Sequence, residues 1–573
     1  MGTLFSALDI GRAGMMVAQV QLDVTGHNIS NVNKEGFSRQ RVELTTRVPN
    51  YKPYGALGRG PAIEGVVRLR ESFLDQVYWK QIPGLGEATL QTTYYTQIED
   101  IFQEPSDTGF STHLNTFFDS LQDFANNVED LPTRVSLLAE AEAMAATMNE
   151  TGQRLTLLRT TANEEIRELV PSINSVTGRI AALNEAIRDA ELGGNTANDL
   201  RDDRDLLVDE LAEMVNIVVR ERDDGTYDIL LGGSMLVTGH KARELETVTD
   251  ATIDPDRPDF LAVQFADNGE AALIPGGALY GAMQVRDVEL RGLEDQLDNI
   301  ALTLIEAIND IHTQGNGLEN IGIALTTSNG IQGASTDPLN TVGLPFTIED
   351  GAFDLVVYDA AGAVIETITV PVDTTGAVPG QTTLEDIRAA IDASASMSAV
   401  INADGTLTVT PGAGISFTFA NDSSGVLTAL GLNGLFTGSS ASTIGVSQHL
   451  LDHPAYLTSG YSLDVLETGD NTAALAMAAV RSAALMEGGT QTINDYLESM
   501  IAQVGIRSQA NQDTLDVAEA VVEDYNRRRQ EVSAVSVDEE VTSLIQFQRA
   551  FEASARVITV ADAMLETLVN LVR

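Results

Sequence analysis

Residues 541–572 read VTSLIQFQRAFEASARVITVADAMLETLVNLV, with apolar side chains at alternating steps of three and four residues. A spacing of about 3.5 residues is the seam of a coiled coil. The stretch therefore predicts a long C-terminal helix that packs along one stripe, with polar seam residues that would fix its register at some cost in stability. The seam positions are Val541, Leu544, Gln548, Phe551, Ala555, Ile558, Asp562, Leu565, Val569 and Val572.

The start of the chain repeats this pattern. Its seam positions are Leu4, Leu8, Gly11, Met15, Ala18, Leu22, Thr25, Ile29 and Val32. They predict a helix from about Leu4 to Ile29, whose small residues allow another helix to come close but weaken it in isolation by up to about 1 kcal/mol per glycine. We expect the two ends to pack on each other, on neighbouring copies, or on both. The alternative is a pair of amphipathic core helices in an ordinary globular protein.

Composition limits the class of protein. The 573 residues are enough for several domains, and the net charge of −49 argues against nucleic acid and an anionic membrane as partners. The first 50 residues carry five basic and four acidic side chains, and the last 43 carry three basic and seven acidic. The middle therefore holds nearly all of the charge, and the ends are close to neutral, as expected of surfaces that become buried.

Several signals are absent from the sequence. Without cysteine there are no disulfides, no thiol catalysis and no zinc–thiolate sites. No stretch approaches 18 apolar residues, so no membrane-spanning helix is expected. No cleavable signal peptide is visible, because no uninterrupted apolar run follows Arg12. From these facts alone the expected location is the cytoplasm.

Changes of periodicity along the chain predict a multidomain α and β fold. Its parts are terminal coiled-coil helices, a stalk formed by a bundle of long helices, and β-rich hairpin and α+β outer domains. Pro171 falls in a long helical pattern and should kink or start a helix there. The predicted domains are a terminal coiled-coil domain (1–38 and 536–573), a helical bundle domain (39–215, 286–319 and 456–535), a β-rich hairpin subdomain (216–285) and a variable acidic α+β outer domain (320–455).

Two regions carry specific secondary-structure signals. The turn Asp223-Asp224-Gly225 between two alternating apolar runs predicts a β-hairpin. Within 320–455 one helix is expected at Leu384–Ala393. Strand-like runs occur there at 353–358, 364–370, 406–410 and 415–419.

Few residues offer catalytic or metal-binding chemistry. His449 and His453 are four residues apart, a spacing that could place two metal ligands on one helical face, but Pro454 follows at once and favours a loop. The run LRDDRD at 200–205 alternates in charge and predicts a solvated helical face. We identify no catalytic set, no cofactor site and no metal site, and we expect no enzymatic activity.

Residues 25–38, TGHNISNVNKEGFS, resemble the N-terminal signature of the bacterial flagellar rod, hook and hook-associated protein family. The family pattern reads roughly Asn-Asn-Ile-Ala-Asn-x-x-Thr-x-Gly-Tyr. The departures from it are mild, at His27, Ser30, Asn33 and Phe37. The residues that form its turn motif here are Gly26, Asn28, Asn31, Gly36 and Phe37.

Further runs extend this resemblance. Residues 537–541 and 544–558 are similar to the family's C-terminal motif, and runs at 102–109, 121–127 and 199–207 are similar to hook-associated proteins. The resemblance covers about 1–315 and 470–573. The segment 320–455 matches poorly, and we expect it to vary between relatives.

The resemblance implies a structural axial protein at the junction between hook and filament, without a cofactor. Such a protein would polymerise through its terminal helices into a ring or helical array that lines the inner tube, and would contact the hook protein and a filament-side hook-associated protein. It would leave the cell through the type III export apparatus without a cleavable signal peptide and would be extracellular, in the flagellum. A flagellar export chaperone would hold the C-terminal helix.

The resemblance and the seams together select the interface residues. The N-terminal assembly positions are Leu4, Leu8, Met15, Ala18, Leu22 and Ile29. The C-terminal assembly and chaperone positions are Val541, Leu544, Phe551, Ala555, Ile558, Leu565 and Val569. Two other functions stay open from the sequence: the filament-side hook-associated protein, and a secreted adhesin or sugar-binding module carried by 320–455.

Overall fold

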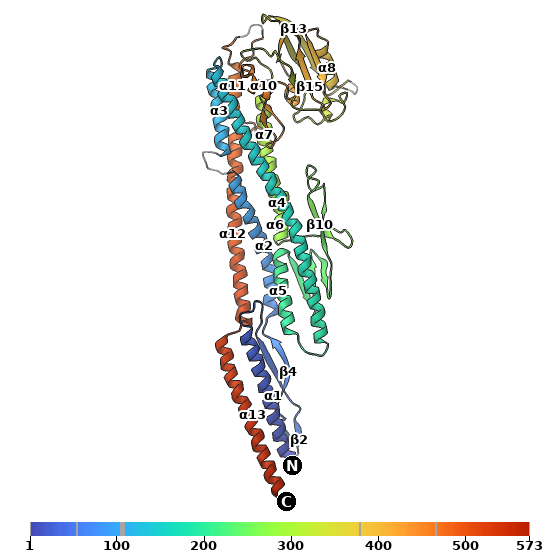
Figure 1. The fold of residues 1–573 in the computed structure, drawn as a ribbon, viewed down its shortest axis with the longest axis vertical. Helices are drawn as coiled ribbons and strands as arrows, with labels where there is room; N and C mark the ends of the chain where they lie inside the picture. The colour runs from blue at the N-terminus through green and yellow to red at the C-terminus, as the bar shows by residue number, and fades with distance from the viewer. Residues whose placement is uncertain (1, 53–54, 103–108, 377–379, 464–466, 572–573) are drawn as a thin grey trace. The chain divides into compact units, whose positions relative to one another are not determined.

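The computed structural model describes residues 2–52, 55–102, 109–376, 380–463 and 467–571 (Figure 1). These residues form two compact units. Unit 1 contains the described residues of 1–93, 161–287 and 510–573, and unit 2 those of 94–160 and 288–509. Three long helices contribute residues to both units: α2 (Ser72–Phe102), α4 (Leu131–Glu191) and α12 (Ile493–Ser533).

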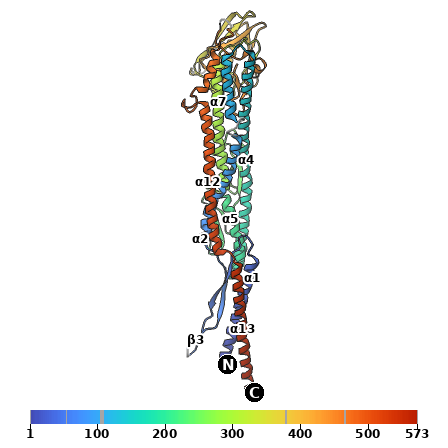
Figure 2. The ribbon, with the colours of Figure 1, turned by 90° about the vertical axis from the view of Figure 1, so that its left-hand side faces the viewer.

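In unit 1 the two ends of the chain form a helix pair. Helix α1 (Gly2–Ser30) and helix α13 (Val537–Leu571) lie side by side and antiparallel, with the N- and C-termini at the same end (Figure 2). This confirms the helices predicted at both ends. Beside α1, strand β1 (Gln40–Thr46) pairs with β4 (Pro61–Arg68), and the short strands β2 (Asn50–Lys52) and β3 (Gly55–Leu57) pair with each other. Residues 40–68 therefore contain four short antiparallel strands.

The rest of unit 1 packs helices against antiparallel strands. Helix α5 (Asn198–Met214) precedes a sheet in the order β5 (Ile217–Glu221), β6 (Tyr227–Leu231), β7 (Ser234–Thr238) and β8 (Lys241–Ala242). Strand β9 (Leu245–Thr249) pairs with β10 (Leu261–Phe265). The β5–β6 turn confirms the hairpin at Asp223-Asp224-Gly225, where Gly225 has a φ of 76°. Helix α6 (Ala278–Gln284) and the π-helical turn η1 (Val285–Glu289) follow, and α6 is too short to show a helical period in the sequence.

The core of unit 1 forms where α2, α4 and α5 meet these strands. Its buried side chains include Trp79, Ile173, Leu207, Ile229 and Leu279. Helix α4 continues through Pro171, so no helix starts there, and the other predicted alternative, a kink, stays a prediction. Proline removes one backbone hydrogen bond, and the burial of Ile166, Val170 and Ile173 on both sides of it holds the helix together.

Unit 2 combines helices with two small three-stranded sheets. One sheet has the order β13 (Val364–Val372), β12 (Gly351–Tyr358) and β16 (Ser416–Ala420). The other has the order β11 (Leu325–Thr326), β15 (Leu407–Pro411) and β14 (Met397–Ile401). The shorter strands β17 (Phe436–Thr437) and β18 (Gly445–Val446) pair with each other. The helices are α3 (Phe110–Asn126), α7 (Leu290–His312), α8 (Leu384–Asp392), α9 (Val426–Leu430), α10 (Gln448–Asp452) and α11 (Thr472–Ala479), with 3-10 turns η2 (Leu339–Thr341), η3 (Pro454–Tyr456) and η4 (Val480–Ser482).

The strands and the helix predicted within 320–455 are confirmed. Helix α8 begins with a capping box, in which the side chains of Thr383 and Asp386 each accept a hydrogen bond from the other residue's backbone N–H. Strand β14 was not predicted. Of the run at 102–109, residues 103–108 lie outside the described residues. None of the described helices is both long enough and apolar enough to cross a membrane.

Candidate assembly interface

The two terminal helices come close at glycines of α1. A Cβ atom on Gly11 would lie 2.8 Å from Ile558 Cγ1, and one on Gly14 would lie 2.7 Å from Ser554 Oγ. Side-chain carbon atoms pack at about 3.5–4.0 Å, so a Cβ atom at Gly11 would force Ile558 and the Ser554 carbonyl oxygen away, whereas at Gly14 rotation of the Ser554 hydroxyl would relieve the contact. The pairing lies within one chain, which was one of the alternatives that the seams left open.

The contact stripe of α13 follows only part of the predicted seam. Leu544, Phe551, Ile558 and Leu565 are half-buried as predicted, but Gln548 and Asp562 are exposed. The residues one step earlier complete the stripe instead: Glu540, Phe547, Ser554 and Ala561, of which Glu540 and Ala561 are buried. The proposed role of the polar seam residues in setting the register within the chain is therefore wrong. The sequence alone does not distinguish the predicted seam from the observed stripe, because both sets of positions recur at steps of three and four residues.

The other predicted interface residues lie at different depths. Ala18 is buried, Leu8, Met15, Leu22, Ile29 and Ala555 are half-buried, and Val541 and Val569 are exposed. The side chain of Leu4 and all of Val572 lie outside the described residues.

A second apolar stripe of α13 was missed in the sequence. It consists of the exposed side chains Ile545, Val557, Val560 and Met564. Three of these follow each other at steps of three and four residues, which is the signal that could have identified them. No element among the described residues covers this stripe.

The turn motif holds the end of α1 against β1 and α13. Asn28 is buried and its side-chain amide exchanges two 3.0 Å hydrogen bonds with the backbone of Gln40. The same amide donates to Glu540 Oε2 at 3.1 Å. Asparagine suits this position because its side chain donates and accepts at once. The motif residue Asn31 donates to the carbonyl oxygen of His27 at 3.0 Å.

The remaining motif residues shape the turn itself. Gly36 has a φ of 75°, a conformation that favours glycine. The ring of Phe37 packs edge-on against His27, with ring centroids 5.4 Å apart. Gly26 is exposed, and a Cβ atom there would meet nothing within 4 Å.

Arg39 connects the start of β1 to the start of α13. Its Nε donates to Glu540 Oε1 at 2.7 Å and its Nη1 donates to Glu539 Oε2 at 2.8 Å. The Glu540 side chain is only 3% exposed, so it receives bonds from both Arg39 and Asn28 in a buried setting. Bonds from a charged donor to a carboxylate are among the strongest in proteins.

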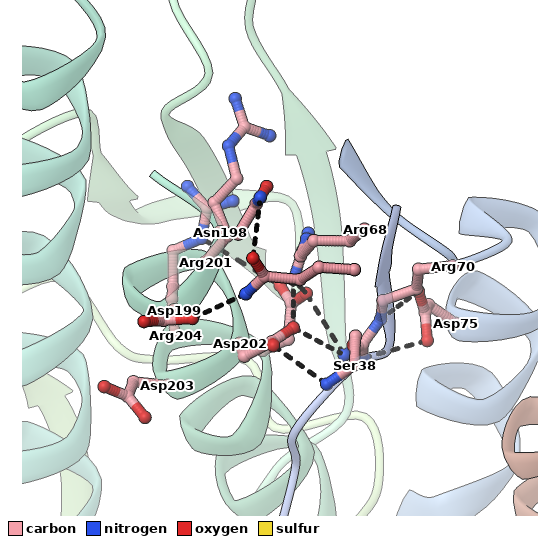
Figure 3. A network of polar contacts seen from close by, with 12 residues as sticks. Ser38, Arg68, Arg70, Asp75, Asn198, Asp199, Arg201, Asp202, Asp203 and Arg204 are labelled. Carbon is pink, nitrogen blue, oxygen red and sulfur yellow. Dashed lines mark hydrogen bonds and ion pairs between the residues drawn. The ribbon is translucent and has the colours of Figure 1, made fainter. Parts of the chain in front are cut away.

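The charged run at 200–205 is mostly buried, and the predicted solvated helical face is wrong. Asp202, Arg204 and Asp205 are at most 1% exposed (Figure 3). Arg68 Nη1 donates to Asp202 Oδ1 at 2.7 Å and to Asp205 Oδ2 at 2.8 Å, and the backbone N–H of Ser38 donates to Asp202. These partners come from β4 and from the end of the turn motif, far from α5 in the sequence.

The network continues from β4 to the end of α12. Arg70 forms two hydrogen bonds with Asp75, and the Arg529 guanidinium lies 2.9 Å from both Asp75 and Asp209. The Asp209 carboxylate also accepts a 2.6 Å bond from Trp79 Nε1. Alternating charges therefore join β4, α2, α5 and α12 in unit 1.

The pKa values of two buried carboxyl groups in the network, Asp202 and Asp205, are shifted in opposite directions. Burial alone would raise the pKa of Asp205, but the guanidinium groups of Arg70 and Arg68 outweigh it and lower that pKa. For Asp202 burial prevails over Arg68 and Ser38, and its pKa is raised. Arg204 has its guanidinium 3.4 Å from the centre of the Tyr227 ring, and burial lowers its pKa.

The histidines that were considered as metal ligands lie in unit 2. His449 is in helix α10 and not in the predicted loop, and the helix ends at Asp452, ahead of Pro454. Its Nε2 lies 3.3 Å from Asn433 Oδ1, and burial lowers its pKa to about 4. The described residues contain no group of three or more histidine and carboxylate side chains that could hold a metal ion.

Comparison with known proteins identifies the relatives of this chain. Residues 95–325 match the family model of the flagellar hook-associated protein FlgK helical domain, and residues 528–571 match that of the flagellar basal body rod FlgEFG protein C-terminal region. Over 99% of its length the chain is 27% identical to flagellar hook-associated protein 1 of Salmonella typhimurium, which it covers completely. The homologues are flagellar hook-associated proteins. The resemblance found in the motifs is confirmed.

A second sequence relative and a solved structure are also hook-associated or hook junction proteins. Flagellar hook-associated protein 1 of Bacillus subtilis is 25% identical over all of this chain and 99% of its own length. The solved flagellar hook junction protein FlgK from Burkholderia pseudomallei has a TM-score of 0.50 and 20% identity, covering 81% of this chain and all of its own. The multidomain α and β fold predicted from the sequence is thus shared with a hook-associated protein.

Proposed function

We propose that this chain is a structural axial protein of the bacterial flagellum, located at the junction between hook and filament. The observation that carries the proposal is the match to flagellar hook-associated protein 1 over essentially the full length of both chains. The C-terminal match to rod proteins supports an axial role, because it covers all of helix α13.

Polymerisation through the terminal helices is the next part of the proposal. Helix α13 covers one stripe against α1 and leaves Ile545, Val557, Val560 and Met564 exposed. Exposed apolar side chains that lie together on one helix face, such as Val557, Val560 and Met564, are typical of an interface with another protein. The predicted interface residues, including Leu8, Met15, Phe551 and Leu565, would then contribute both to the pair within one copy and to the packing of copies in a ring or helical array.

The proposed partners follow from this position. They are the hook protein, a filament-side hook-associated protein, the type III export apparatus and an export chaperone that holds α13 before assembly. The proposed location is extracellular, in the flagellum, and the protein would have no enzymatic activity. The division into a terminal inner-tube domain, a helical bundle, a β-rich subdomain at 216–285 and an outer domain at 320–455 is part of the same proposal.

Deletion of residues 541–573 tests the proposed function. The truncated chain should fail to join the hook tip in a flagellated host that lacks its own homologue, while limited proteolysis shows the rest of the chain folded. Normal filaments built on the truncated chain would sink the proposal.

A pair of substitutions provides a matched control. Phe551→Asp places a charge in the half-buried stripe of α13, and Thr559→Asp places the same charge on an exposed polar position of the same helix. Only the first should reduce incorporation at the hook tip.

A further inference from the structure

The segment that joins β1 to β4 has an unusual charge for this chain. Residues 45–62 carry three basic and no acidic residues, although the whole chain has a net charge of −49. Tyr51 and Val48 are 78% and 77% exposed. Arg47, Lys52 and Arg59 are also exposed, and none forms an ion pair with a residue that the structure describes. We call Arg47, Val48, Tyr51, Lys52 and Arg59 the hairpin tip.

A groove of about 790 Å³ lies elsewhere on unit 1, between the turn at 32–38, the start of α2, helix α5 and the end of α12. Leu74, Leu206 and Val532 give it partly exposed apolar walls. Its edge carries four exposed carboxylates that form no ion pair within the described ranges: Glu35, Glu71, Glu210 and Glu213. We call this hollow the acidic groove.

The tip and the groove of one copy cannot meet. Strand β1 starts beside Asn28, whereas a Cβ atom on Gly60 would lie 3.3 Å from Ala13 Cβ, so the strands run back along α1. From Ala13 to Ser30 the helix rises by about 25 Å, and the groove begins beyond that end, at Val32. Figure 2 shows β3 on the side of the two chain ends, away from α12.

We propose that the hairpin tip of one copy docks in the acidic groove of a second copy of this chain. The inference rests on the proposed function, in which copies lie side by side. The opposite charges would steer the approach, and burial of Tyr51 and Val48 on the apolar walls would provide most of the affinity.

This contact has a definite symmetry. In the proposed array each copy places its tip in the groove of one neighbour and receives the tip of another neighbour in its own groove, which is a heterologous contact. Heterologous contacts extend from copy to copy and give a ring when the rotation closes or a helical array when it does not. A head-to-tail contact of this kind matches an axial assembly, whereas a reciprocal exchange of tips between two copies would give a closed two-fold dimer.

Engineered cysteines test the docking with the full chain, which has no cysteine of its own. Copies with Asn50→Cys, which keeps Tyr51 and Val48 in place, are mixed with copies carrying Glu210→Cys in the groove, oxidised, and analysed for the mixed disulfide dimer. Docking raises the local thiol concentration far above that in solution, so the yield should exceed by about tenfold that of Asn50→Cys with Glu185→Cys, an exposed position on α4. The excess should shrink at high salt, which screens exposed charges.

A second experiment tests whether the opposite charges of the tip and the groove are needed for docking. On the copy that supplies the tip, Arg47→Glu with Lys52→Glu should lower the disulfide yield to that of the control pair. On the copy that supplies the groove, Glu210→Lys with Glu213→Lys should then restore the high yield. In this second experiment the groove cysteine is Glu71→Cys. All these side chains are exposed, so folding is unaffected. Equal yields for the groove and control positions, or a yield that ignores the charge reversal, would overturn the docking. If a chain with Arg47→Glu and Lys52→Glu still joined the hook normally, the docking proposal would fail but the proposed function would stand. The proposed function is tested separately, by the terminal truncation.

Discussion

At the scale of residues, the Asp205 carboxylate is fully buried between the guanidinium groups of Arg68 and Arg70. Asp205→Asn keeps the shape but removes the charge, which leaves two buried cations with less compensation. We expect a loss of about 3–5 kcal/mol in the free energy of unfolding of unit 1. The single tryptophan, Trp79, lies in the core of unit 1, so its fluorescence during urea unfolding measures this loss.

Asp203→Asn is the control on the same helix. Asp203 pairs with Lys34 at 2.9 Å, with both side chains more than 40% exposed. An exposed pair contributes at most about 1 kcal/mol. Equal losses for the two variants would show that the buried network does not stabilise unit 1.

His312 in unit 2 predicts a pH dependence. It is fully buried, with Nδ1 2.8 Å from Asn433 O and Nε2 accepting a 3.1 Å bond from the Thr458 N–H, so both ring nitrogens are engaged in the neutral form. Burial lowers its pKa to about 3 from an ordinary 6.5. Above pH 6.5 both folded and unfolded chains hold it neutral. Below that pH the unfolded chain gains the proton first, so stability falls by up to about 1.4 kcal/mol per pH unit.

His312→Gln should reduce this slope. Unfolding in urea, followed by circular dichroism at a series of pH values from 7 down to about 4, measures the slope. Part of it should remain, because the pKa of His449 is also lowered by burial. His240→Gln, at an exposed histidine, should leave the slope unchanged. The prediction fails if the His312 and His240 variants behave alike.

A side chain's role could be predicted from the sequence only where the signal lies in neighbouring residues. Asn28 was identified as a functional residue because a recognisable motif surrounds it. The burial of Asp202 and Asp205 was missed because their partner Arg68 lies 134 and 137 residues away, and the local charge pattern offers nearer partners. A local pattern contains no information on such a pairing.

At the scale of elements, the α1–α13 pair depends on Gly11. Gly11→Leu would place side-chain atoms where Ile558 and the backbone of Ser554 lie, and the helices should move apart. Spin labels on cysteines introduced at the exposed positions Asp9 and Val560 measure the separation as a distance distribution. The distribution should shift to longer distances and broaden.

Gly26→Ala is the matched change on the same helix. A Cβ atom at Gly26 meets nothing within 4 Å, and alanine should stabilise α1 by up to about 1 kcal/mol. An unchanged distance distribution in Gly11→Leu would mean that the close approach does not hold the pair together.

Periodicity predicted the elements that are long or have strong turn chemistry. Helix α1 and the β5–β6 hairpin are examples. It failed at α6, which has seven residues, and at the register of α13, where neighbouring residues such as Phe547 and Gln548 give equally regular stripes. Burial against α1 chooses between those stripes, and burial is a tertiary property.

At the scale of the whole molecule, the two chain ends should be the least stable part of an isolated copy. Helix α13 leaves one apolar stripe uncovered and is mostly exposed, whereas α4 and α7 carry continuous buried faces. In proteins, helices gain most of their stability from tertiary packing. We expect amide hydrogen exchange to be fast in residues 2–30 and 541–571 and slow in the interiors of α4 and α7. Strong protection of both ends in the free protein would contradict this.

The hydrogen bond between Asn28 and Glu540 spans 512 residues of chain. Closing a flexible loop of that length costs about 5–6 kcal/mol, several times the net stabilisation of one hydrogen bond. The bond therefore forms only after the elements between its partners have folded and brought them together. During synthesis α1 is made first and its partner α13 last, so we expect the α1–α13 pair to be the last part of the molecule to form.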